Sequence, residues 1–270
     1  MRPQVPGVTR RRWWCLGLAS FAISLIVLAP AALIEFATSR TAGTNARFAA
    51  DGGTIWRGQG RILIVANAAN VADAAAVMIP IAWRFDPLAL LGLRLGVFVD
   101  ANAAALAGTA HIAYGFGGIE LRETALAADA RLLSIAHSAA VIFAPTGKIR
   151  LQQTSDERLI VRPAANNDAW RVDGSMGLNT EQLAFGGVVN APVGSHQLKL
   201  RGDGAAINIS ILRSTGPLKL EGAGTLTLAA PRRFTFSGFA TTTADAPASL
   251  KQLGPLMADG RQRIELNTTW

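Results

Sequence analysis

The residue types that most often carry out chemistry are few in this chain of 270 residues, and they lie far apart. The three histidines are His111, His137 and His196, and none is part of a His-x-x-x-His or His-Glu-x-x-His spacing. We expect each of them at a solvent-facing strand position rather than in a metal site. The only cysteine is Cys15, which excludes an intramolecular disulfide and a cysteine-based metal centre.

The glycine-rich stretches do not match the patterns that activate a nucleophile or bind a nucleotide. No Gly-x-Ser-x-Gly elbow is present. The run that starts at Gly115 has Glu120 where a dinucleotide fingerprint needs its third glycine. After Gly147-Lys148 comes Ile149, where a phosphate-binding loop needs Ser or Thr. The acidic residues are sparse and stand in turn or edge contexts, so we expect solvated carboxylates. The sequence therefore predicts no catalytic residue, no cofactor and no metal.

The positive charge of the chain is concentrated at its start. The formal net charge is +8, but Arg2, Arg10, Arg11 and Arg12 precede a hydrophobic segment, and the rest has 22 basic against 18 acidic residues. No basic cluster is interleaved with aromatic residues, as a nucleic-acid groove requires. The composition argues against nucleic-acid binding.

A hydrophobic segment near the N-terminus predicts a membrane anchor. No charged residue occurs from Trp13 to Ile34, a run of 22 residues, which is enough to cross a bilayer core of about 30 Å as a helix. The preceding arginines predict a cytoplasmic tail over 1–12, an anchor over 13–36 and a periplasmic domain over 41–270. Pro30 is expected to bend or end the helix. The alternative is a cleaved signal peptide with a processing site near residues 29–32.

The elements after residue 40 are predicted to be strands and turns. Alternating arms flank Gly202-Asp203-Gly204 and the glycines after Tyr114, and 147–163 reads as a hairpin with its turn at 154–156. Asp173-Gly174 reads as a turn or bulge. Short helical turns are expected at 86–93, capped by Asp86, and within 244–256. About ten to fifteen short strands indicate a mainly β fold: a curved antiparallel sheet, either an open groove or sandwich-like.

The stretch Gly53-Thr-Ile-Trp-Arg-Gly58 is the most distinctive pattern in the chain. Gly52 and Gly53 allow the chain to reverse its direction with positive φ. If strand alternation starts at Thr54, then Trp56 and Gly58 share its face and Arg57 points to the other. We interpret Trp56 as a packing residue of a hairpin and Arg57 as part of an outward contact surface.

Four blocks in order resemble type II secretion system protein N. They are GTIWRG (53–58), IAWRFDPLALLGLRL (81–95), GPLKLEGAGTLTL (216–228) and LKQLGPLMADGRQRIEL (250–266). The resemblance implies an inner-membrane protein whose periplasmic β-domain belongs to the apparatus that secretes folded proteins. Its partners would be the inner-membrane platform proteins and the outer-membrane secretin. The family-motif positions that could mediate interaction are Gly53, Trp56, Arg57, Gly58, Trp83, Pro87, Gly216 and Pro217.

Two other classes of function stay open beside this structural role. AsmA-like envelope proteins share the Gly-Thr-x-Trp-x-Gly hairpin, and likeness to them implies an open β-groove that handles lipid. Such a groove would have one apolar face over successive strands, which alternating pairs such as Leu198 and Leu200 allow. An envelope enzyme is the third and least favoured hypothesis.

Overall fold

The computed structural model describes residues 10–41, 46–65, 76–136, 144–164, 170–186, 189–244, 246–252 and 254–269. The helical elements are α1 (Arg10–Val27), α2 (Ala32–Thr41), η2 (Pro87–Gly92), α3 (Leu132–Ala136) and η3 (Ala248–Gln252). The strands are β1 (Ala46–Gly53), β2 (Arg57–Val65), β3 (Ala76–Asp86), β4 (Arg94–Asn102), β5 (Leu106–Gly115), β6 (Gly118–Asp129), β7 (Pro145–Gln152), β8 (Leu159–Pro163), β9 (Trp170–Phe185), β10 (Val189–Gly204), β11 (Ala206–Thr215), β12 (Leu218–Thr227), β13 (Arg233–Thr242) and β14 (Gln262–Thr269).

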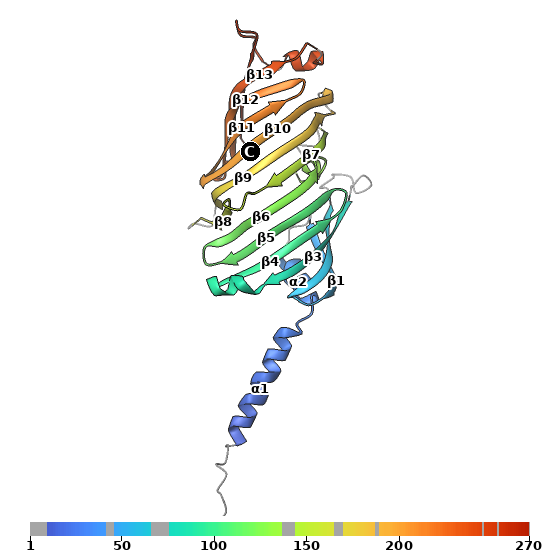
Figure 1. Ribbon diagram of the computed structural model, residues 1–270, viewed down its shortest axis with the longest axis vertical. Coiled ribbons are helices and arrows are strands. Elements are labelled where there is room, and N and C mark those ends of the chain that lie inside the picture. The colour runs from blue at the N-terminus through green and yellow to red at the C-terminus, as the bar shows by residue number, and fades with distance from the viewer. Residues whose placement is uncertain are drawn as a thin grey trace, which may run out of the picture.

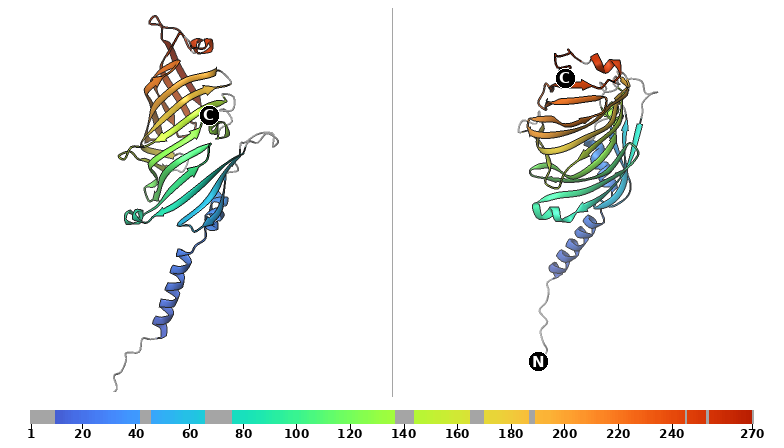
Figure 2. Two further views of the ribbon diagram at one scale, coloured as in Figure 1. Left: turned by 45° about the vertical axis from the view of Figure 1, so that its right-hand side comes forward. Right: turned by 45° about the horizontal axis from the view of Figure 1, so that its top comes forward.

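All the strands belong to one antiparallel sheet of 14 strands. Its order follows the chain from β1 to β14, except that β7 and β8 share the place between β6 and β9. The sheet is long, twisted and curved, with α1 projecting from one end and β13 near the other (Figures 1 and 2). The predicted mainly β, antiparallel architecture is confirmed, and it takes the form of a single sheet rather than two stacked sheets.

The two faces of this sheet differ sharply in polarity. Cross-strand partners share a face, and neighbours in a strand point to opposite faces. Leu151, Leu178, Leu198 and Ile211 are successive partners across β7, β9, β10 and β11, and all are half-buried. The adjacent row, on the opposite face, is polar and consists of Arg150, Asn179, Gln197 and Arg213. We call the first the apolar face.

The apolar face continues towards both ends of the sheet. Trp83 on β3 is opposite Val99 on β4, which is opposite Ala110 on β5. On the other side, Ile207 is opposite Leu226, and Leu226 is opposite Phe234. One small buried cluster lies near the C-terminal end, where η3 packs on the sheet; its members are Val193, Leu218, Ala240, Ala246 and Leu250.

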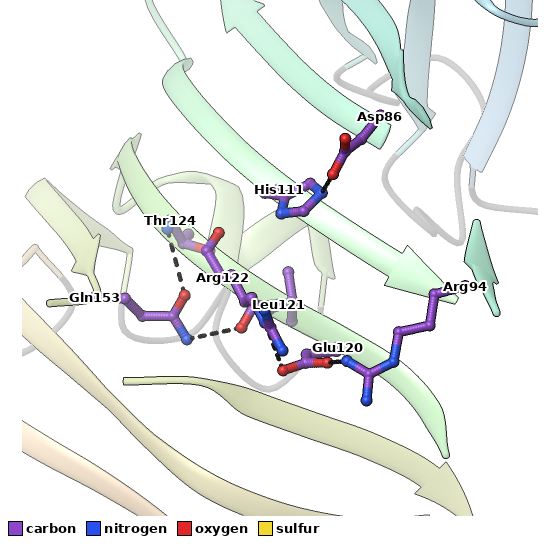
Figure 3. Close-up of polar contacts among 8 residues, drawn as sticks. All are labelled: Asp86, Arg94, His111, Glu120, Leu121, Arg122, Thr124 and Gln153. Carbon is purple, nitrogen blue, oxygen red and sulfur yellow. Dashed lines mark hydrogen bonds and ion pairs between the residues drawn. The ribbon is translucent and has the colours of Figure 1, made fainter. Parts of the chain in front are cut away.

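The Gln153 side chain hydrogen-bonds to β6 at the junction between β7 and β8. Gln153 lies just after β7 and is 9% exposed. Its backbone N–H donates to the Thr124 carbonyl at 2.9 Å, its Oε1 accepts from the Thr124 N–H at 3.3 Å, and its Nε2 donates to the Leu121 carbonyl at 3.3 Å (Figure 3). The carboxamide thus makes bonds that a peptide group of a continuous strand would make. The predicted hairpin over 147–163 is wrong, because β7 and β8 both pair with β6 and β9, not with each other.

Other local predictions have mixed outcomes. The turns at Gly115–Gly118 and after Gly202 are confirmed, as are the helical turns η2 and η3. Asp173-Gly174 does not form a turn, because both residues lie within β9 and keep their register with β8 and β10; Gly174 has a φ of 103° there.

The N-terminal helix is shorter than the sequence predicts. α1 ends at Val27, and a new helix, α2, starts at Ala32. Pro30 lies in the break, as expected for a residue that lacks a backbone N–H and clashes with the preceding turn. The anchor predicted over 13–36 is therefore not one continuous helix. Within the described ranges, no helix is long and apolar enough to cross a membrane.

Candidate functional site

The Gly53–Gly58 segment forms a tight loop that joins β1 to β2. Gly53 ends β1 with a φ of 94° and is the register partner of Gly58. The Thr54 N–H donates to the Arg57 carbonyl at 2.9 Å, and Thr54 Oγ1 accepts from the N–H groups of Trp56 and Arg57, both at 3.3 Å. The prediction that Thr54, Trp56 and Gly58 share one strand face is therefore wrong, because Thr54 to Trp56 form the turn itself.

Trp83 and Phe85 of β3 contact the loop through hydrogen bonds and a ring contact. The Trp83 indole Nε1 donates to the Ile55 carbonyl at 3.2 Å, and the Phe85 N–H donates to the Trp56 carbonyl at 2.6 Å. The Trp56 ring meets the Phe85 ring edge-on, with centroids 4.8 Å apart. Trp83 is 6% exposed, whereas Trp56 is only half-buried. Trp83 is thus the buried packing residue that the sequence analysis assigned to Trp56.

Gly58 is required by the position of Trp83. A Cβ at Gly58 would lie 2.4 Å from Cζ2 of the Trp83 ring and 2.7 Å from the Gly52 carbonyl oxygen. No residue other than glycine fits there without movement of the ring or the strand.

The same loop also holds the N-terminal helices. The Ile55 N–H donates to the Ala29 carbonyl at 3.0 Å, and the Ala31 N–H donates to the Gly53 carbonyl at 3.1 Å. Ala29 and Ala31 are both buried. The loop therefore clasps the segment between α1 and α2 on one side and β3 on the other. We call Gly53–Gly58 with its partners Ala29, Ala31, Trp83 and Phe85 the clasp.

The surface beside the clasp is a groove of about 720 Å³ on the polar side of the sheet. Arg57 is exposed at its rim, in agreement with the predicted outward position. Arg84 lies over the Phe98 ring, with its guanidinium carbon 5.1 Å from the ring centroid, and both residues line the groove. Arginine and aromatic side chains are enriched at protein–protein contacts. That Arg57 contacts a partner stays a prediction.

Pro87 follows Asp86, which belongs to a polar cluster that sequence spacing did not reveal. Asp86 caps η2 by accepting the Leu88 N–H with Oδ1 at 3.0 Å, and Pro87 is the first residue of that turn. Asp86 Oδ2 lies 3.2 Å from Nε2 of His111 (Figure 3). The His111 ring stacks on the Phe98 ring, with the ring centroids 4.3 Å apart. Since His111 is 9% exposed, the prediction of a solvent-facing position is wrong.

Glu120 forms the second half of the cluster. It is 3% exposed and contacts two arginines, Arg94 through Oε2 and Arg122 through Oε1, the latter at 2.6 Å (Figure 3). Buried carboxylates need such charged partners. The cluster draws its residues from β3, β4, β5 and β6, and the strand register brings these strands together. The predicted solvated carboxylate is wrong for Glu120.

His196 is buried in another part of the sheet. It is 5% exposed, and its Nδ1 lies 2.8 Å from Ser214 Oγ, so it also contradicts the predicted solvent-facing position. Burial lowers the pKa of His196 because the low-polarity surroundings disfavour the imidazolium. His137 lies outside the described residues. Among the residues that are described, no group of three His, Cys, Asp or Glu is arranged to hold a metal ion.

The predicted pair Gly216 and Pro217 does not join the clasp. Both lie in the turn between β11 and β12. Gly216 has a φ of 113°, a Cβ there would lie 2.6 Å from the Gly194 Cα, and the Pro217 carbonyl accepts from the Thr243 N–H at 3.0 Å. Their role in the structure is a close approach of the β11–β12 turn to Gly194 of β10 near the small core.

A family model for type II secretion system (T2SS), protein N, matches residues 47–265, which takes in the sheet from β1 into β14. No curated protein and no solved structure matches the chain. The match covers well over half of the 270 residues and includes the four blocks whose order suggested the resemblance, except for the last residue of the fourth. The chain belongs to the type II secretion system protein N family.

Proposed function

We propose that this protein is a non-catalytic structural component of the type II secretion apparatus, held at the inner membrane with its sheet in the periplasm. Family membership supports a role in type II secretion. The observation that carries the finer proposal is the clasp, which fixes a helix of exposed apolar residues to one end of a long sheet. In α1, Trp14, Leu18 and Phe21 are 74, 72 and 61% exposed.

The membrane placement rests on the polarity of the N-terminal segment. Residues 13–34 carry no charge, and three arginines precede them directly. Apolar side chains that water would disfavour are stabilised in lipid, and arginines on one side favour a cytoplasmic tail. In this placement α1 is the membrane-associated segment, because residues 29–35 already bond to the β1–β2 hairpin, and the sheet extends away from the membrane towards the other secretion components.

Reporter fusions test this topology. An enzyme active only in the periplasm should be active when fused after Trp270 and inactive when fused after Arg12. N-terminal sequencing of the membrane fraction should recover the intact start. A mature protein that begins near Ala32, or activity of the Arg12 fusion, would reject the membrane placement without affecting the family assignment.

A second candidate, lipid handling, is favoured by the apolar face. Its half-buried residues run over successive strands from β7 to β11. A matched pair tests it: Leu198→Lys places a charge on the apolar face, whereas Gln197→Lys places it on the polar face. If lipid occupies the apolar face, phospholipid that co-purifies with the parent should be lost from the first variant only. Absence of bound lipid from the folded parent would reject this candidate.

A further inference from the structure

The two outer edges of the sheet are unlike each other. At the β1 edge, α2 packs beside the strand, and Glu35 Oε2 accepts a hydrogen bond from the Ala50 N–H at 3.1 Å. At the β14 edge, the described residues cover only the start of the strand, where the Arg263 N–H donates to the Pro255 carbonyl at 3.1 Å. Natural sheets usually protect such edges, since an open edge is a template for another strand.

The hydrogen-bonding direction of each β14 residue follows from that contact. In a strand, the N–H and C=O of one residue point to the same side and those of the next residue to the other side. The backbone N–H of Arg263 points away from β13. The backbone N–H and C=O groups of every second residue therefore also point away from β13, namely those of Glu265, Asn267 and Thr269. The backbone groups of the residues between them face β13, namely those of Ile264, Leu266 and Thr268. Within the part of the chain that the structure describes, the outward N–H groups of Glu265 and Asn267 have no backbone partner.

Exposed apolar side chains gather at the same edge. Leu266 is 51% exposed and, as the partner of Phe236, lies on the apolar face. Leu256 is 72% exposed and bridges to Gln262, in the column beyond β14. A strand added next to β14 would follow the column of Leu256 and cover Leu266.

We propose that the open part of the β14 edge, Glu265 to Thr269, accepts an extended segment of a different protein as an additional antiparallel or parallel strand. The segment would carry apolar residues at every second position, so that they lie on the apolar face beside Leu266. Its backbone would satisfy the outward groups of Glu265 and Asn267.

Two arrangements of identical chains fit the structure less well. Addition of β14 to the β1 edge of a second copy is blocked by α2. Pairing of two β14 strands about a two-fold axis places the two α1 helices at opposite ends of the assembly, because α1 and β13 lie at opposite ends of the molecule (Figure 1). Such a pair could not sit in one membrane, so this step rests on the membrane placement proposed above.

The experiment combines a photo-crosslinking residue with a proline scan in the full-length chain, in intact cells that carry the secretion system. A crosslinker at Thr269 should give a discrete adduct with another protein, mapped to an extended segment of it. The same crosslinker at Asn208, on the polar side of β11, should not. Asn267→Pro removes an outward N–H and should lower the adduct yield about tenfold, as the loss of a backbone hydrogen bond plus a steric clash predicts.

Controls keep the result specific to the edge. Leu266→Pro removes an N–H that faces β13, so it should lower the melting temperature, whereas Asn267→Pro should leave the sheet folded. In the purified full-length parent, the amides of Glu265 and Asn267 should exchange faster than those of Ile264 and Leu266.

Each remaining outcome decides the proposal. Slow exchange at Glu265 and Asn267 in the purified chain, no adduct at Thr269, an adduct with a second copy, or an adduct that survives Asn267→Pro would each overturn it. A proline-sensitive adduct with a protein outside the secretion system would instead support the edge and reject the role proposed in secretion.

Discussion

At the scale of single residues, Gly58 is the position of the family motif at which the structure explains the residue type most clearly. Its Cα faces the ring of Trp83 with no room for a side chain. Gly52, the residue before the loop, has no heavy atom within 4 Å of an added Cβ and keeps an ordinary φ, so it is a matched control in the neighbouring strand β1.

We predict that Gly58→Ala lowers the free energy of unfolding by about 1–3 kcal/mol, the usual cost of overpacking. Gly52→Ala should change it by less than about 0.5 kcal/mol, as expected for a substitution into open space. Urea denaturation of the two variants and the parent measures both. Equal stability of the two variants would show that the Trp83 ring does not depend on Gly58.

The buried His196 predicts a pH dependence of stability. Its pKa in the folded state is lowered by burial, so in the unfolded state the ring takes up a proton at a higher pH, near 6.5. Its contribution is fully present above about pH 6.5 and is lost as the pH falls through the folded-state pKa. His196→Asn keeps a donor towards Ser214 without a titrating ring. Urea midpoints at pH 7.5 and 5.5 should differ more for the parent than for the variant; an equal difference would assign the acid sensitivity to other groups.

At the scale of elements, Gln153 holds the junction of β7 and β8. We predict that Gln153→Ala costs about 1–3 kcal/mol, because it leaves the Thr124 N–H and the Leu121 carbonyl without their side-chain partner. Gln152→Ala, one residue earlier and exposed, is the control. Hydrogen exchange of the Thr124 amide should accelerate in the first variant only. If it does not, the Thr124 N–H is protected by some other group.

The elements also show what the sequence could predict. Alternation identified the strands and the hairpin around Gly202-Asp203-Gly204, because the two arms are adjacent in the chain and their apolar residues match in register. It failed at 147–163, where the partners of both arms, β6 and β9, lie outside the stretch that was read. Sequence spacing also gave no signal for the contact of His111 with Asp86 or of Arg94 with Glu120, since pairing of β3 to β6 creates them. The contact of Arg122 with Glu120 lies within β6, where residues two apart share a face.

At the scale of the whole molecule, the clasp shows that the folded unit includes residues before position 41, where the sequence analysis placed its start. The sequence placed the domain over 41–270, yet Ala29, Ala31 and Glu35 all bond to the β1–β2 hairpin. We predict that a chain starting at Ala46 is less stable than one starting at Leu28 by roughly 3 kcal/mol, about 1 kcal/mol for each of these three hydrogen bonds. Thermal melting of both truncations measures the difference. Identical melting temperatures would mean that the clasp orients the helices without stabilising the sheet.

The strand order has a consequence for how the chain is built. Almost every strand pairs with the strand that precedes it, so most strand pairs join neighbouring elements of the chain, which gives a lower contact order than pairing between strands far apart in the chain. Chains of low contact order fold faster, because each loop closure costs little entropy. During synthesis from the N-terminus, each new strand can therefore pair with the strand made just before it, so that the sheet grows by one strand at a time. The one pause falls at β7, whose far side stays open until β9 arrives.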